Sequence, residues 1–134
     1  MTKIIDIEGV GPVYAAKLAK AGIKTVEALL KKGATPKGRE ELAKDSGIDK
    51  TYILEWVNHA DLYRIKGVGE EYSDLLEEAG VDTVVELATR KPENLYAKML
   101  EVNAAKKLVR RPPSLKEVVR WVVEAKKLPR VVKY

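Results

Sequence analysis

Two short glycine stretches contain the residues whose types and spacing could bind a ligand. Each places two glycines around one valine, first as Gly9-Val10-Gly11 and then, 58 positions later (67 − 9), as Gly67-Val68-Gly69. Glycine permits positive φ angles and leaves no Cβ in the way of a ligand. A helical pattern follows each stretch directly, so the unpaired N–H groups of a helix start would point out of the turn. We name these stretches the first and the second glycine turn, and each has the chemistry to hold one phosphate.

The chain around the two glycine turns is also duplicated. Two pairs of residues return at the same offset, Gly22-Ile23 as Gly80-Val81 and Thr25-Val26 as Thr83-Val84. Trp56 and Trp121 stand in similar apolar segments 65 positions apart (121 − 56), so the second half has about seven extra residues. A repeat of this length predicts the duplication of a four-helix unit.

The elements that must position the turns are helices, because apolar residues recur at spacings of three and four. Pro12, Thr25 and Ser114 are typical of helix starts. The helices are expected at residues 13–21, 26–32, 39–45, 50–62, 70–79, 84–89, 92 to about 107 with a break, and 115–128. Residues 33–38 are expected to form a loop, and residues 1–8 are either a short strand or a helix end. The predicted fold is all-α, with compact duplicated four-helix units in one domain of two repeats, 1–65 and 66–134.

Composition excludes several kinds of site. The chain of 134 residues has no cysteine and one histidine, His59, so thiolate and multi-histidine metal sites are excluded. We interpret His59 as a partly exposed helix residue. No nucleophile–base pair, metal cluster or nucleotide loop is found, so we expect no enzyme activity, no metal and no cofactor. The sequence has no apolar run approaching the ~20 residues that a membrane span needs. We therefore predict a cytoplasmic protein without a membrane partner.

Charge is distributed unevenly along the chain. The net charge is +5. Residues 105–134 have ten basic and two acidic residues, whereas residues 66–104 have four basic and nine acidic ones. The abundance of lysine and glutamate also fits a protein from a thermophile. A basic C-terminal part favours an anionic partner.

The glycine turns resemble helix-hairpin-helix motifs. The first carries Ile7-Glu8-Gly9-Val10-Gly11-Pro12 and the second Ile65-Lys66-Gly67-Val68-Gly69. The whole chain resembles a family of uncharacterised tandem helix-hairpin-helix proteins of archaea and bacteria, through Trp56-Val57, residues 64–69 and Thr83-Val84-Val85-Glu86-Leu87-Ala88. The resemblance implies a SAM-like or tandem helix-hairpin-helix fold and, from the motif alone, contact with the nucleic-acid backbone without sequence specificity.

The candidate binding residues are the two turns and nearby basic side chains. They are Gly9, Val10, Gly11, Lys17, Lys20, Lys66, Gly67, Val68, Gly69, Arg110 and Arg111. The second turn departs from the pattern, because Lys17 and Lys20 correspond to Leu75 and Glu78. Glu70 and Glu71 also follow it, and they would repel a phosphate while stabilising the helix start. Lys66 is its one favourable charge. The first turn is therefore expected to be the stronger contact.

Two functions remain open at this point. The first is a nucleic-acid-binding module, with DNA a better candidate than RNA, and with no small-molecule substrate. The alternative is a protein–protein adaptor in which the turns are only structural corners and the acidic second half meets a basic partner. Trp56 and Trp121 are interpreted as core residues in both cases.

Overall fold

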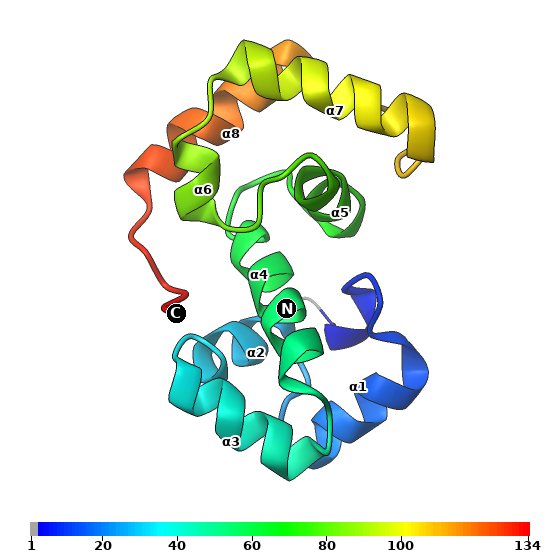
Figure 1. Ribbon diagram of the computed structural model, residues 1–134, viewed down its shortest axis with the longest axis vertical. Coiled ribbons are helices and arrows are strands. Elements are labelled where there is room, and N and C mark those ends of the chain that lie inside the picture. The colour runs from blue at the N-terminus through cyan, green and yellow to red at the C-terminus, as the bar shows by residue number, and fades with distance from the viewer. Residues whose placement is uncertain (1–2) are drawn as a thin grey trace. The chain divides into compact units, whose positions relative to one another are not determined.

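The computed structural model describes residues 3–134, and it is all-α as predicted (Figure 1). Its elements in chain order are η1 (Ile4–Asp6), α1 (Gly11–Lys20), α2 (Val26–Lys32), α3 (Pro36–Ser46), α4 (Lys50–Leu62), α5 (Glu70–Glu78), α6 (Val84–Ala88), α7 (Pro92–Lys106) and α8 (Leu115–Lys127). The N-terminal segment, left undecided between strand and helix end, forms the short 3-10 helix η1. An isolated antiparallel bridge joins Lys3 to Thr25 just before it, and residues 1–2 lie outside the described part.

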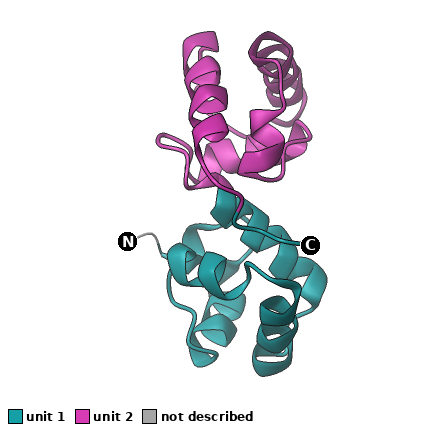
Figure 2. Ribbon diagram, turned by 90° about the vertical axis from the view of Figure 1, so that its left-hand side faces the viewer, with its two compact units in different colours: residues 1–61, 131–134 teal, residues 62–130 magenta. Residues whose placement is uncertain are grey.

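The chain divides into two compact units (Figure 2). Unit 1 contains residues 1–61 and 131–134, and unit 2 contains residues 62–130. The division falls close to the predicted boundary at residues 65 and 66. That both halves form one domain stays a prediction.

The core of unit 1 contains side chains of α1, α2 and α4. Trp56, Val57 and Ile53 of this helix are buried, together with Leu18 of α1 and Leu29 of α2. The α3 helix contacts both α1 and α2. Close packing at the α2–α3 connection needs a glycine, because a Cβ at Gly38 would lie 1.9 Å from the carbonyl oxygen of Lys32.

The last four residues complete unit 1. The Lys133 N–H donates to the Ala34 carbonyl oxygen at 2.7 Å. The buried Arg39 donates to the carbonyl oxygens of Gly33 and Lys133, each at 2.7 Å, and the burial lowers the pKa of its guanidinium. Tyr134 donates to Asn58 Oδ1 at 3.0 Å. These bonds hold residues 131–134 against the α2–α3 connection and α4.

Unit 2 is built on α8, which packs on α6 and α7 (Figure 1). Val118, Trp121, Val122 and Ala125 form its buried face, at helical spacings of three and four. This face joins a core that also contains residues of α5, α6 and α7. A capping box between Ser114 and Glu117 fixes the start of α8.

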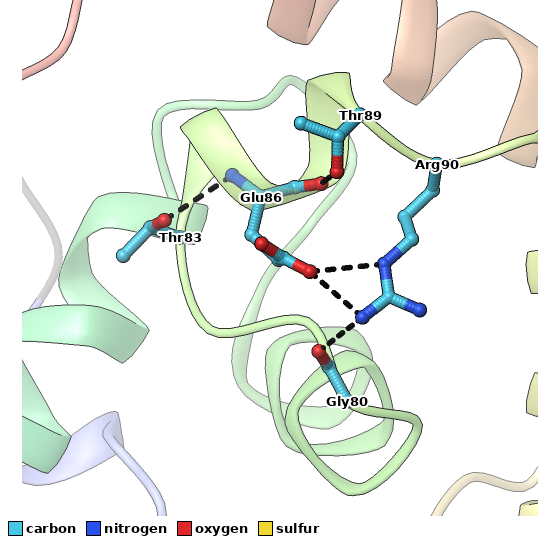
Figure 3. A network of polar contacts seen from close by, with 5 residues as sticks. All are labelled: Gly80, Thr83, Glu86, Thr89 and Arg90. Atoms are coloured by element: carbon cyan, nitrogen blue, oxygen red, sulfur yellow. Dashed lines mark hydrogen bonds and ion pairs between the residues drawn. The ribbon is translucent and has the colours of Figure 1, made fainter.

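The connection between α5 and α6 is held by a polar network (Figure 3). Thr83 Oγ1 accepts from the Glu86 N–H at 3.3 Å and so caps α6. Arg90 Nη2 donates to the Gly80 carbonyl oxygen at 2.7 Å and to Glu86 Oε1 at 2.8 Å (Figure 3). Thr89 donates to the Glu86 carbonyl oxygen at 2.7 Å. Arg90 therefore ties the end of α6 back to the turn that precedes it.

Three predictions about helices were wrong, and the first concerns α1, which begins at Gly11 and not at residue 13. The α3 helix begins at Pro36 and not at residue 39, so half of the expected 33–38 loop is helical. Thr35 caps this helix by accepting from the Gly38 N–H at 3.1 Å, and Pro36 suits the first helical position. The α7 helix has no break, because it continues to Lys106 and ends at Lys107 with a φ of +53°.

Candidate nucleic-acid interface

The first glycine turn has two residues in left-handed backbone conformations. The φ angle is +91° at Gly9 and +63° at Gly11. The Val10 side chain is buried and its N–H donates to the Ile7 carbonyl oxygen at 3.1 Å, which anchors the turn in the core. A Cβ at Gly11 would meet no described atom within 4 Å, so this side of the turn faces open space.

The second glycine turn has a nearly equal backbone at its first glycine. Gly67 also has a φ of +91°, Val68 is buried, and the Val68 N–H donates to the Ile65 carbonyl oxygen at 3.0 Å. Gly69 differs from Gly11, because its φ is −119° and its ψ is −153°. Any residue can adopt this extended conformation, so only Gly67 needs to be glycine for backbone reasons in this turn.

An indole ring lies against each turn. A Cβ at Gly9 would be 3.5 Å from Trp56 Nε1, and one at Gly67 would be 3.5 Å from Trp121 Nε1. Both tryptophans are buried, at 2% and 0% exposure, which agrees with their interpretation as core residues. Trp121 Nε1 has no hydrogen-bond partner among the described residues. Each turn therefore packs against a buried indole ring.

Both turns lead directly into a helix whose first N–H groups have no side-chain cap among the described residues. This holds for α1 after Val10 and for α5 after Gly69. Pro12 has no N–H, so α1 presents fewer donors than α5 does. Glu70 and Glu71 are exposed in the first turn of α5, as the sequence indicated.

Lys17 and Lys20 are both exposed in the last turn of α1. Lys17 Nζ lies 5.7 Å from the centroid of the Tyr14 ring. At a rise of about 1.5 Å per residue, the Lys17 backbone is about 9 Å along the helix from Gly11. The two lysines thus extend a positive surface along α1 from the turn, and they also stabilise the C-terminal end of the helix dipole.

The charge around the second turn differs from the sequence prediction. Lys66 is exposed, and its N–H donates to Glu124 Oε2 at 3.2 Å. A Cβ at Gly67 would be 3.0 Å from Arg120 Nη2. Lys66 is therefore not the only favourable charge, because the Arg120 guanidinium lies directly on this turn.

Arg110 and Arg111 lie on the connection between α7 and α8, and both are exposed. Arg111 makes two hydrogen bonds to the Glu117 carboxylate, at 3.1 and 3.3 Å, and its carbonyl oxygen accepts from the Tyr72 hydroxyl at 2.9 Å. The bonds from Arg111, and then the one from the Ser114 N–H, lower the pKa of Glu117. The Arg111 charge is thus already paired, whereas Arg110 is the more accessible of the two for an anion.

Two residues near the turns were missed by the sequence reasoning. Arg120 precedes Trp121, just as Glu55 precedes Trp56, so the alignment of the two tryptophans contains this exchange of charge but does not show that Arg120 lies at the turn. Tyr52 is 47% exposed and lies with its ring centroid 6.1 Å from that of Trp56. The sequence feature that could have indicated Tyr52 is its position four residues, or about one helical turn, before Trp56.

The interpretation of His59 as partly exposed was wrong, because its side chain is only 2% exposed. The residues around it from Trp56 to Leu62 are almost all buried. A helix segment that is buried on most of its faces has no one-sided apolar pattern, so the sequence gives little indication of this burial.

The family model described as a domain of unknown function (DUF4332) matches residues 8–128. This match covers both glycine turns and every helix from α1 to α8, and the chain belongs to this family. No curated protein and no solved structure matches the chain. In the described residues, no helix has both the length and the apolar character needed to cross a membrane.

Proposed function

We propose that this chain binds the backbone of nucleic acid, DNA rather than RNA, without reading its sequence. In this proposal the glycine turns are two helix-hairpin-helix motifs in duplicated four-helix units. The observation that carries it is the first turn itself, in which two positive-φ glycines lead into a helix start without a side-chain cap. Backbone donors at such a positive helix end suit a phosphate oxygen.

The equivalence of the two turns supports the proposed duplication. Beyond Gly9 and Gly67, the second connections also correspond, with φ of +88° at Gly22 and +95° at Gly80. Thr25 caps α2 as Thr83 caps α6, by accepting from a backbone N–H at 3.1 and 3.3 Å respectively. Corresponding backbone conformations at the same offset of 58 residues favour one ancestral unit.

Electrostatics supports the first turn as a contact. Lys17 and Lys20 on α1 continue the positive surface that begins at the helix start, although the exposed Glu8 beside Gly9 opposes it. A duplex concentrates negative charge along its axis, so a few such lysines give a salt-dependent and sequence-independent affinity.

The test is a fluorescence-anisotropy titration with unrelated DNA and RNA oligonucleotides at several salt concentrations. If about four phosphates are neutralised, log affinity for duplex DNA should fall with a slope of about −3.6 against log salt. The double variant Lys17→Glu, Lys20→Glu should weaken binding to all sequences alike. The control is Lys37→Glu, Lys44→Glu, which makes the same charge change at exposed positions of α3. Absence of binding at low salt would contradict the proposal.

A second candidate function, protein–protein interaction, is favoured by a specific feature of unit 2. Leu115, Val119 and Val123 lie at spacings of four on α8 and are 38%, 37% and 45% exposed. This stripe is apolar on a helix whose opposite face is already buried in the core. Sedimentation velocity of the chain and of Val119→Asp would show whether the stripe mediates self-association, which the aspartate should abolish.

A further inference from the structure

Three aromatic side chains form a cluster beside the first glycine turn. The ring centroids of Tyr14 and Trp56 are 5.1 Å apart, those of Tyr14 and Tyr52 5.9 Å, and those of Tyr52 and Trp56 6.1 Å. The planes of Tyr52 and Trp56 are inclined by only 17°, so these two rings are stacked. Trp56 joins the cluster to the turn, since its Nε1 is 3.5 Å from the Cβ position of Gly9.

The three rings of this cluster differ in their exposure to solvent. Trp56 is buried, whereas Tyr52 is 47% exposed at the start of α4. Lys17 Nζ approaches the Tyr14 ring at 5.7 Å, which places a positive charge at the edge of the cluster. An exposed tyrosine ring that is backed by a buried indole loses little conformational freedom when another planar group stacks on it.

We propose that Tyr52 is a stacking platform for an unpaired base of single-stranded nucleic acid whose backbone is held at the first glycine turn. This inference rests on the proposed function, and it specifies that the bound nucleic acid is single-stranded. Bases in a duplex are stacked on each other inside the helix, so their flat faces cannot reach a side chain on the protein surface. A base in a single strand is free to do so, and every base has a face that an aromatic ring can contact.

The charges around Tyr52 fit a single strand that passes over the cluster from the α1 side. Lys17 and Lys20 are cations on that side. The α4 region has two exposed acidic residues, Asp49 and Glu55, and one exposed lysine, Lys50. The backbone phosphates are therefore attracted towards α1, and the bases face Tyr52.

Unit 2 has no such platform. Tyr72 and Trp121 form a pair like Tyr14 and Trp56, with ring centroids 5.2 Å apart and planes inclined by 54°. The residue that corresponds to Tyr52 by the tryptophan offset is Glu117 (52 + 65), whose carboxylate is bound by Arg111 and Ser114. The exposed ring is therefore a property of the first turn alone.

The experiment compares three ligands of equal length on the intact chain at low salt. They are a labelled single-stranded DNA 12-mer, the same strand with abasic sites in its central half, and the corresponding duplex. The variants are Tyr52→Leu, which removes the ring, and Tyr52→Phe, which keeps the ring and serves as the control. Ring proton shifts of Tyr52 in NMR spectra provide a second readout.

We expect the single strand to bind at least about fivefold more tightly than the abasic strand, the lower bound for one aromatic–base stack. Tyr52→Leu should abolish this difference and Tyr52→Phe should keep it, and upfield shifts of the Tyr52 ring should appear only with bases present. Equal binding of the intact and abasic strands, or an equal loss of duplex affinity in Tyr52→Leu, would overturn the platform and leave backbone binding intact. No binding of any ligand would overturn both proposals.

Discussion

Gly9 and Gly67 adopt the same φ angle of +91°, and a Cβ at either position would lie 3.5 Å from an indole nitrogen, but the two glycines are surrounded by different side chains. The first turn has an exposed tyrosine cluster and lysines along α1. The second has the Arg120 guanidinium directly on its glycine, acidic residues at the helix start, and an extended Gly69 in place of a left-handed Gly11. The backbone of such a turn is thus compatible with two quite different surfaces.

This comparison changes the expected asymmetry between the turns. From the sequence, the second turn had one favourable charge, Lys66, against Glu70 and Glu71. With Arg120 beside Gly67, the second turn also has a second cation, although the Glu124 carboxylate accepts a hydrogen bond from the Lys66 N–H of the same turn. The two turns therefore differ in the type of side chain beside them. The first has the Tyr52 ring and the lysines of α1, and the second has the Arg120 guanidinium.

The largest expected effect concerns the indole behind each turn. Trp56→Ala and Trp121→Ala should each lower the free energy of unfolding by about 3–5 kcal/mol, because both side chains are buried and leave a cavity. Urea denaturation followed by circular dichroism measures the loss. Val13→Ala, at a 68% exposed position of α1, is the control and should change stability by less than about 0.5 kcal/mol. A small loss for only one tryptophan would show that the turns do not depend equally on their indoles.

The second prediction separates the two turns by their second glycine. Gly11→Ala should destabilise by about 1–2 kcal/mol, because a φ of +63° is unfavourable for alanine. Gly69→Ala should change stability by less than about 0.5 kcal/mol, because its backbone is extended and its Cβ would meet no described atom within 4 Å. The two alanine variants are each other's controls in one denaturation series. Equal losses would mean that the backbone difference between the turns is absent in solution.

The third prediction tests whether the second turn binds at all. Arg120→Ala should weaken binding to unrelated DNA sequences alike and reduce the slope of log affinity against log salt by about 1, as expected for the loss of one phosphate contact. Lys116→Ala, at an exposed position of the same helix, serves as the matched control. An unchanged slope for Arg120→Ala would leave the first turn as the sole contact.

The smallest expected effect is a pH dependence that arises from Glu117 in unit 2. Arg111 and the Ser114 N–H hold the pKa of Glu117 below its unfolded value, so this stabilisation is present above the unfolded pKa and is lost as pH falls through the folded pKa. Glu117→Gln should therefore lower the melting temperature at pH 7, and the difference from the unmodified chain should shrink with acidification. Calorimetry between pH 7 and 3 measures it. Glu101→Gln, a change at an exposed and weakly paired carboxylate, should show no such trend.

Much of the local structure could be predicted from the sequence. The bounds of α2 and α4 agree with the predicted ranges, and those of α5, α6 and α8 agree to within one residue. Threonine and serine caps, glycine stops and apolar spacing act over a few residues, so they are visible in the chain itself. The start of α3 was missed because Thr35-Pro36 was interpreted as a loop and not as a cap followed by a first helical proline.

Only the tertiary structure decided what surrounds each turn. Arg120 reaches Gly67 across about fifty residues of chain, and Tyr52 meets Tyr14 across nearly forty. The return of residues 131–134 to unit 1 depends on Arg39, which binds carbonyl oxygens of both Gly33 and Lys133. Backbone conformation follows from nearby residues, whereas the charge and aromatic surface of a site follow from helix packing between distant segments. The sequence by itself therefore determined the two glycine turns and their helices, and packing decided that one carries a tyrosine and the other an arginine.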